Sequence, residues 1–345
     1  MTLSTGFERV SLSLAEPFGI ARGRTDTAEN VLVHVEAEEA AGVGAAAPSA
    51  YYGESPASVE SVLPDLLAAV REVGDPHAGQ ALAHRLADIA PEAAAARAAV
   101  SVAAHDLAAG RAGEPLYRRW GLDPGAAPPT SHTVGIDTAE RMGRKAARAR
   151  EAGYPILKVK VGTDDDRARL RAVREAAPEA RIRVDANCAW DPATAVERTA
   201  WLAEMGVEFL EQPVPADDVD GLRHVTEAGA LPVAADESCV TARDVPRVAD
   251  AVDIVVVKLM KCGGLGPAVG QIATAGAHGL EVMLGCMVES NAAIAGACHL
   301  APLVEYADLD GALLLAEDRY DGVPMPDGRI RLADVGTGTG ARPRE

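Results

Sequence analysis

The strongest constraint on the fold is a repeated alternation of short β-branched runs with helical segments from about residue 130 onward. Each run ends in a polar residue and leads into an amphipathic stretch rich in Ala, Arg and Glu, such as 138–153 or 192–206. Strands that alternate with helices in this way indicate βαβ units and a parallel sheet. The predicted strands are 131–136, 156–161, 181–185, 207–211, 232–236, 253–258, 281–285 and 303–310.

The same repeat sets the domain boundaries. Eight strands in series favour a closed barrel over an open, doubly wound sheet. No further helical unit follows the eighth strand, so we expect an α/β fold, a modified TIM barrel of (β/α)7β type over residues 126–312. The last segment, 313–345, is rich in Gly and Pro and is expected to pack back on the N-terminal part of the chain.

The first 125 residues show a different pattern. Residues 7–18 and 30–48 are typical of strands in a small antiparallel sheet, and residues 19–29 join them. Three helical stretches follow, at 55–73, 77–89 and 91–112. We therefore predict an α+β capping domain, residues 1–125, placed before the barrel.

Composition argues against several kinds of partner and site. The formal net charge of −18 disfavours nucleic acid or an anionic membrane as partner. No stretch approaches the roughly 20 apolar residues of a membrane helix, and the N-terminus does not resemble a signal peptide, so a cytoplasmic location is expected. The five cysteines are odd in number and none are at C-x-x-C spacing, which indicates neither a disulfide framework nor a zinc site.

Lysine is rare in this chain, and its placement is informative. Four of the five lysines fall in two short clusters, LKVKVG and VKLMKCGG, whereas arginine occurs 28 times. Lysine suggests proton-transfer chemistry here, because it can lose its proton at a workable pH and arginine cannot. Lys158 and Lys160 are two residues apart and so both face into the barrel, and Lys258 ends a strand four βα units later. We expect Lys158 and a metal ion to lower the pKa of Lys160.

Three carboxylates close three consecutive predicted strands. Asp185, Glu211 and Asp236 are spaced 26 and 25 residues apart, so their side chains are expected at one mouth of the barrel. Converging carboxylates repel one another unless a cation lies between them. An oxygen-only donor set selects a hard ion such as Mg²⁺, which keeps positions open for substrate oxygens. Taken singly, each carboxylate is better explained as a helix N-cap after a strand, but three in register between two lysine clusters reverse that preference and favour the metal site.

The expected chemistry is proton transfer at a carbon next to a carboxylate. A carboxylate substrate bound on Mg²⁺ would have Lys160 on one face of its α-carbon and Lys258 on the other. One lysine removes the α-proton, the metal stabilises the enediolate, and the opposite lysine returns a proton to the other face.

These motifs resemble the enolase superfamily, and in particular its muconate-lactonizing subgroup, which has a lysine on both sides. The matching motifs are, in chain order, KVK, DAN, EQP, DES, VKLMKCGG and GCMVES, and the resemblance covers nearly the whole chain. It implies that Lys160 and Lys258 are the acid/base pair, with one Mg²⁺ per subunit on the three carboxylates and Lys158 as an auxiliary cation. It also implies supporting roles for Asn187, Glu237 and Lys261. Glu289 is expected either at the rim of the pocket or as a helix-start carboxylate.

Within that subgroup the chain is most similar to dipeptide epimerases of the L-Ala-D/L-Glu type. Asp308 and Asp310 match a D-x-D pair that holds the substrate ammonium in those enzymes, and Thr133 matches a substrate-contacting position. The segments FGIARGRTDTAENVLVHVE and YYGES resemble their specificity loops, in which Arg22 or Arg24 could pair with a substrate side-chain carboxylate. Cys188 and Cys262 stand where Gln, and Ser or Ala, are frequent.

The sequence therefore predicts a Mg²⁺-dependent dipeptide epimerase, an isomerase that acts on a small-molecule substrate. It does not decide whether the chain forms a homo-oligomer. Within the same fold, the alternatives are an N-acylamino acid racemase or o-succinylbenzoate synthase, and then a muconate cycloisomerase. A Schiff-base aldolase would use one of the lysines, but its mechanism would not require the three carboxylates. A non-catalytic binding barrel would not need lysines on two opposite faces.

Overall fold

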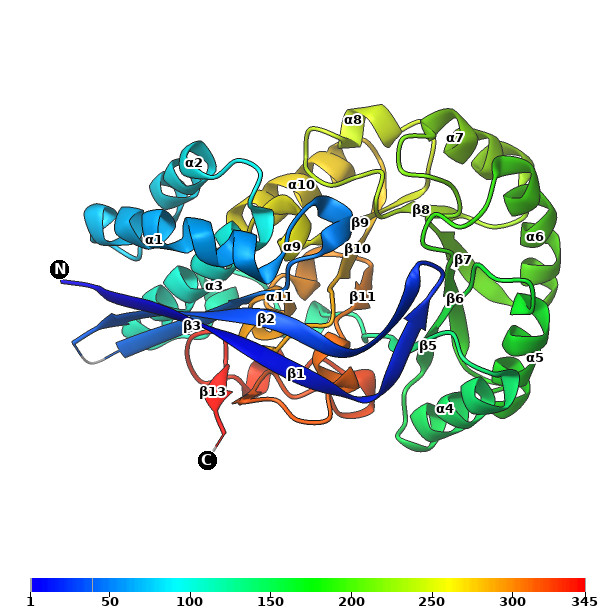
Figure 1. Cartoon of the computed structure of the whole chain (residues 1–345), viewed down its shortest axis with the longest axis horizontal. Helices are drawn as coiled ribbons and strands as arrows, with labels where there is room; N and C mark the ends of the chain where they lie inside the picture. Colours follow the sequence, from blue (N-terminus) through cyan, green and yellow to red (C-terminus); the bar gives the residue numbers. More distant parts are fainter. Residues whose placement is uncertain (1, 39, 345) are drawn as a thin grey trace.

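The computed structural model describes residues 2–38 and 40–344, and its centre is a parallel sheet of eight strands in consecutive order (Figure 1). The strands are β4 (His132–Val134), β5 (Ile156–Lys160), β6 (Arg181–Asp185), β7 (Val207–Glu211), β8 (Val233–Ala235), β9 (Ile254–Lys258), β10 (Glu281–Gly285) and β11 (Tyr306–Asp308). A parallel bridge between Thr130 and Ala307 brings the first and last strands together. The predicted barrel and all eight predicted strand positions are confirmed.

Helices follow these strands on the outside of the sheet, and α4 to α8 form an arc around it in Figure 1. They are α4 (Ala139–Glu151), α5 (Asp166–Ala176), α6 (Pro192–Glu204), α7 (Val219–Ala228), α8 (Val245–Val248), α9 (Leu259–Cys262), α10 (Leu265–Ala277) and α11 (Asn291–Cys298). Several begin at a residue whose side chain accepts a backbone N–H of the first turn, as Thr138, Asp191 and Ser290 do. Because helices cover the strands from outside, every residue of β5 and β9 is buried, lysines included.

The capping domain contains an antiparallel sheet and three helices. Its strands β1 (Ser4–Ile20), β2 (Gly23–Ala37) and β3 (Ala40–Ala46) lie in chain order, and α1 (Pro56–Val73), α2 (Gly79–Ile89) and α3 (Ala94–Arg111) confirm the three predicted helices. Strand β3 packs very closely on α3. A Cβ atom on Gly42 or Gly44 would lie 2.1 or 2.2 Å from a backbone oxygen of α3, so only glycine permits this contact.

The segment 19–29, expected as a connecting loop, is strand for most of its length. β1 pairs with β2 from Ser4↔Glu36 to Ile20↔Gly23, with a register shift between Ser13 and Phe18, and residues 21 and 22 form the turn at the tip. The two strands form one long hairpin, drawn in blue in Figure 1, that reaches from the capping domain across to the barrel. The chain therefore covers the barrel mouth with a strand pair, which is stiffer than a loop.

The C-terminal segment contacts the capping domain at several points. The backbone of Gly338 exchanges hydrogen bonds with Glu114 and Leu116, and Ala316 N–H donates to the Ser13 carbonyl. Two short strands, β12 (Tyr320–Asp321) and β13 (Arg342–Pro343), pair with each other. The 3-10 helices are η1 (Ala50–Tyr52), η2 (Leu116–Trp120), η3 (Pro124–Ala126), η4 (Ala301–Leu303), η5 (Gly311–Leu314), η6 (Pro326–Gly328) and η7 (Leu332–Asp334). Across residues 2–38 and 40–344, no helix has the length and apolar character needed to cross a membrane.

Candidate active site

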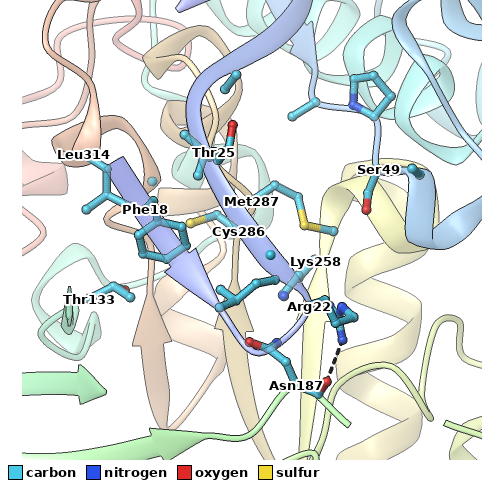
Figure 2. A pocket seen from close by; sticks show the side chains of 18 of the residues that line it. Phe18, Arg22, Thr25, Ser49, Thr133, Asn187, Lys258, Cys286, Met287 and Leu314 are labelled. Carbon is cyan, nitrogen blue, oxygen red and sulfur yellow. Dashed lines mark hydrogen bonds between the residues drawn. The ribbon is translucent and has the colours of Figure 1, made fainter. Parts of the chain in front are cut away.

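A cavity of about 560 Å³ lies between the β1–β2 hairpin and the barrel mouth. Its upper wall is mainly apolar and comes from the capping domain, including Phe18, Ile20 and Tyr52. Figure 2 shows the hairpin crossing this space with Lys258 beneath it. The charged residues of the cavity wall are Arg22, Arg24, Glu29, Lys158, Lys160, Asp236, Glu237, Lys258, Asp308 and Asp310. Thus most of the site residues predicted from sequence share one cavity.

The two predicted acid/base lysines enter the cavity from opposite sides. Lys160 ends β5 and Lys258 ends β9, four strands apart in a ring of eight. Lys160 Nζ donates to Asp185 Oδ2 at 2.5 Å, and Lys258 Nζ donates to Asp236 Oδ2 at 2.7 Å. Burial opposes the charge on Lys258, but the nearby carboxylates, Asp236 first and then Glu211 and Glu237, together outweigh it and raise the pKa of this lysine. A metal ion on Asp236 would weaken that attraction, because it would compete for the same carboxylate charge.

Strand register places the three predicted metal ligands side by side. Lys160 is the lateral neighbour of Asp185, and Asp185 is the lateral neighbour of Glu211. Asp185 and Glu211 are fully buried and do not line the cavity, but each contacts a lysine that does, Lys160 or Lys158. Asp236 lines the cavity and follows the next strand, β8, and we call these three carboxylates the acidic floor. Burial raises the pKa of Glu211 to about 8, with the nearby Asp185 charge as the next cause. The pKa of Asp236 lies well below its usual range: burial opposes its ionisation, but Lys258 and Lys261 outweigh it.

The other two lysines are tied to the protein by several contacts each. Lys158 Nζ donates to Glu211 Oε1 at 2.9 Å and to Asp308 Oδ2 at 2.7 Å, and lies 3.3 Å from Asp185 Oδ2. Lys261 Nζ donates to Asp236 Oδ1 at 2.6 Å and also to three backbone carbonyls. Both ammonium groups are therefore positioned to hold carboxylates in place.

The acidic floor fits a hard cation by its chemistry. Within the part of the chain that the structure describes, no three side chains already converge as a preformed metal site, because lysine ammonium groups occupy the space between the carboxylates. Three buried oxygens there accept no hydrogen bond: Glu211 Oε2, Asn187 Oδ1 and Glu237 Oε2. Glu211 Oε2 lies 2.7 Å from Lys158 Nζ but without hydrogen-bond geometry. Buried oxygens without donors are the ligands that Mg²⁺ takes.

Asp308 and Asp310 line the cavity, but both carboxylates already have partners in the protein. Asp308 accepts hydrogen bonds from Lys158 and from the Ser131 hydroxyl. Asp310 accepts the Thr133 N–H at 2.5 Å and the Thr133 hydroxyl at 3.0 Å. Burial and the Asp308 charge raise the pKa of Asp310 to about 7. The pair therefore adds two carboxyl groups to the cavity wall, and the Lys158 ammonium lies beside one of them.

The predicted specificity residues do not behave alike. Arg22 Nη1 donates to Glu237 Oε1 at 2.7 Å and to the Asn187 carbonyl at 2.9 Å, so its guanidinium contacts the protein. Arg24 is exposed, lines the cavity and forms no ion pair with any described residue. Glu289 is buried beneath the rim, where it accepts the Met287 N–H at 2.6 Å, and it does not line the cavity.

Three contacts of the site were not foreseen from the sequence. Ser131 supports Asp308, and its place two residues before Thr133, on the same strand face, was the available signal. Tyr51 stacks on Arg22, with the guanidinium carbon 4.4 Å from the ring centroid. Its hydroxyl lies 3.6 Å from Cys188 Sγ. No sequence spacing links these residues, because they come from three separate loops.

Two family models match the chain. The model described as mandelate racemase/muconate lactonizing enzyme, N-terminal domain, matches residues 5–121, and the enolase C-terminal domain-like model matches residues 141–345. Among curated proteins, the L-Ala-D/L-Glu epimerase of Bacteroides thetaiotaomicron is 37% identical over 94% of this chain and 84% of its own length.

Solved structures resemble the whole chain. The dipeptide epimerase of Enterococcus faecalis V583, complexed with Mg and L-Leu-L-Tyr, has a TM-score of 0.91 and 32% identity over 99% of both chains. The N-succinyl Arg/Lys racemase of Bacillus cereus has a TM-score of 0.93 and 29% identity, over 100% of this chain and 96% of that one. The similarity therefore includes both the cap and the barrel.

Proposed function

This chain belongs to the mandelate racemase/muconate lactonizing enzyme family of the enolase superfamily, and on that premise we propose that it is a dipeptide epimerase. The enzyme inverts the α-carbon of the C-terminal residue of a dipeptide. The observation that carries this proposal is the placement of Lys160 and Lys258 on opposite sides of one cavity, above buried carboxylates. Two bases on opposite faces of one carbon are what stereoinversion requires.

Each lysine acts on one face of the substrate. A neutral Lys160 removes the α-proton of one epimer, while a protonated Lys258 donates a proton to the opposite face. The roles reverse for the other epimer. A forward turnover leaves Lys160 protonated and Lys258 neutral, and a reverse turnover restores the starting protonation states. Asp185 and Asp236 orient the two amines, because each accepts a hydrogen bond from one of them.

Asp185, Glu211 and Asp236 would hold one Mg²⁺ per subunit. The bound ion supplies positive charge that stabilises the negative charge developing on the substrate carboxylate. Asn187 and Glu237 support this end of the cavity: Asn187 Nδ2 donates to Asp185 at 3.3 Å and lies 3.5 Å from Glu237 Oε1. Their remaining buried oxygens face the same charge-rich region.

The other end of the cavity suits the amino terminus of a dipeptide. Asp308 and Asp310 place two carboxylates there, and an ammonium group can donate to both. Thr133 fixes Asp310 through two hydrogen bonds. Of the two cap arginines that line the cavity, Arg22 is paired with Glu237, whereas Arg24 forms no ion pair with a described residue and can meet an acidic side chain of the substrate.

A second candidate is racemisation of an N-acylated amino acid, favoured by the high structural similarity to the N-succinyl Arg/Lys racemase. Such a substrate has no free α-ammonium group. The internal partners of Asp308 and Asp310 make this reading worth testing. Asp310→Asn removes the charge and keeps the shape; it should raise KM for a free dipeptide and leave KM for an N-acylamino acid unchanged.

Proton exchange tests the proposal directly. The protein is incubated with Mg²⁺ in D₂O and with dipeptides that carry acidic, hydrophobic or basic C-terminal residues. Loss of the α-proton signal of the C-terminal residue, together with formation of the second diastereomer, is the expected NMR result. N-acetylated versions of the same dipeptides are the matched control, because they lack the ammonium group. If no dipeptide exchanges its α-proton, the proposal is wrong.

A further inference from the structure

Arg22 lies at the tip of the β1–β2 hairpin and connects the cap to the barrel (Figure 2). Its Nη1 donates to the Asn187 carbonyl at 2.9 Å and to Glu237 Oε1 at 2.7 Å. The Glu237 side chain is 1% exposed, whereas the Arg22 side chain is 34% exposed. The tip of the cap is therefore held by a charge-assisted bond to a buried carboxylate, which is stronger than a surface ion pair.

The same guanidinium also contacts a second segment of the cap, the short helix η1. The ring of Tyr51, in η1, stacks on Arg22 with 4.4 Å between the guanidinium carbon and the ring centroid. The Tyr51 hydroxyl reaches Cys188, which follows Asn187 in the loop after β6. One arginine thus joins two cap segments to two barrel loops, and these four segments enclose one side of the cavity.

The barrel groups that Arg22 contacts stand next to the acidic floor. Asn187 adopts a positive φ of 45°, and its N–H and side-chain amide both donate to Asp185. Glu237 directly follows Asp236. A non-glycine residue with positive φ needs surrounding contacts to hold it, and the Arg22 bond to the Asn187 carbonyl is one of them.

We infer that Arg22 is a positioning residue that fastens the cap over the bound substrate and holds the loops of Asn187 and Glu237 in place. Both protein contacts use Nη1, and the positioning role rests on these two hydrogen bonds. We call the contacts of Arg22 with Asn187 and Glu237 the latch. The expected effect on KM rests on the proposed dipeptide substrate, but opening of the latch can be measured without turnover. Arg22 acts through Asn187 and Glu237, whereas Lys160 and Lys258 stay where they are when it is removed.

The kinetic test compares Arg22→Gln, Arg22→Lys and Arg9→Gln. Arg9 lies in β1 of the same hairpin and pairs with Glu60 at the surface, away from the cavity, so Arg9→Gln is the matched control. For Arg22→Gln we expect KM for the dipeptide to rise about tenfold and kcat to change less than about threefold, because the lysines remain in position. Arg22→Lys keeps the charge but not the two-sided contact and should give an intermediate KM.

Limited trypsin digestion tests the latch independently of activity. The bond after Arg24 lies near the hairpin tip, and its cleavage reports how often the tip opens. In Arg22→Gln this bond should be cut about tenfold faster than in the wild type or in Arg9→Gln, at an unchanged melting temperature.

The outcomes separate the two proposals. Faster cleavage with a raised KM supports the inference. Equal cleavage in Arg22→Gln and the wild type overturns it, and faster cleavage with unchanged KM overturns the positioning role. If no dipeptide is turned over by the wild type, the proposed function fails, while faster cleavage in Arg22→Gln still supports the latch.

Discussion

At the scale of single residues, the four lysines of the site divide by how many of their donors the protein uses. Lys158 and Lys261 each donate to two or more groups. Within residues 2–38 and 40–344, Lys160 and Lys258 each donate to one carboxylate. An ammonium group has three donors, so these two keep capacity to meet a substrate. The number of hydrogen-bond partners therefore agrees with the acid/base roles expected for Lys160 and Lys258 and with the supporting roles expected for Lys158 and Lys261.

The placement of the two lysines predicts that each substitution affects exchange from one epimer only. Lys160→Ala should abolish α-proton exchange from one epimer, and Lys258→Ala should abolish it from the other, because each lysine faces one side of the carbon. The loss should be on the order of 10²–10⁴-fold, the usual contribution of a positioned acid or base. NMR of each pure diastereomer in D₂O measures both rates. Equal losses for both epimers in both variants would contradict the two-face arrangement.

The acidic floor predicts a dependence on metal ions. Treatment with EDTA should abolish exchange, and Mg²⁺ should restore it. Mg²⁺ at about 100 times its Kd should also stabilise the fold by about 2.7 kcal/mol, because it binds only the folded chain. Thermal unfolding with and without Mg²⁺ measures this gain. In Asp185→Asn, one ligand loses its charge and most of the gain should vanish; a full gain in this variant would place the metal elsewhere.

At the scale of elements, helix α3 begins without a capping side chain of its own, and Glu54 fills that place from the segment after η1. Both Glu54 carboxylate oxygens accept the Ala95 N–H, at 3.0 and 3.3 Å. Burial raises the pKa of Glu54 to about 7, although the Ala95 N–H and Arg97 favour the charged form. A raised pKa means that the folded state binds more protons than the unfolded state between about pH 4.3 and 7.

The free energy of unfolding should therefore fall as the pH rises through that range. Glu54→Gln removes the titrating group, so the part of the decrease in the free energy of unfolding that Glu54 causes should disappear. Urea unfolding of both proteins at pH 5 and pH 8 measures the effect: the wild type should lose more stability between the two pH values than Glu54→Gln does. Other buried carboxyls, such as Glu289, titrate in both proteins and cancel in this comparison. An identical pH dependence would show that Glu54 stays ionised throughout.

The elements also show how far the sequence could predict the fold. Strands such as 181–185 and 281–285 were predicted at their observed bounds, because each is a short segment with apolar residues that is bounded by Asp, Gly or Pro. The segment 19–29 was expected as a loop, because its Gly and polar residues carry no strand signal. Its extended form comes from pairing within the long hairpin. The Arg22–Glu237 bond spans 215 positions, and no local pattern encodes such a contact.

At the scale of the whole molecule, cap, barrel and C-terminal segment meet at one buried junction. Asp106 of α3 accepts the N–H of Val43 at 3.0 Å, and the N–H and hydroxyl of Thr339 at 2.6 and 3.0 Å. His299, after α11 of the barrel, accepts the Tyr117 N–H at 3.0 Å, and its other ring nitrogen lies 3.0 Å from the Thr339 carbonyl. This junction links three parts of the chain far from the cavity.

Asp106→Ala should therefore weaken the whole fold without changing the chemistry. The substitution leaves the Val43 and Thr339 N–H groups buried without acceptors, which should cost about 3 kcal/mol in the free energy of unfolding. Because the contacts of His299 with Tyr117 and Thr339 remain, unfolding should stay a single transition at a lower urea midpoint, and kcat should stay at the wild-type value. Asp65→Ala, at an exposed position of α1, is the control and should shift stability by less than about 0.5 kcal/mol. Two separate transitions in Asp106→Ala would mean that the junction is what makes cap and barrel unfold together, and an unchanged midpoint would mean that other contacts hold the C-terminal segment.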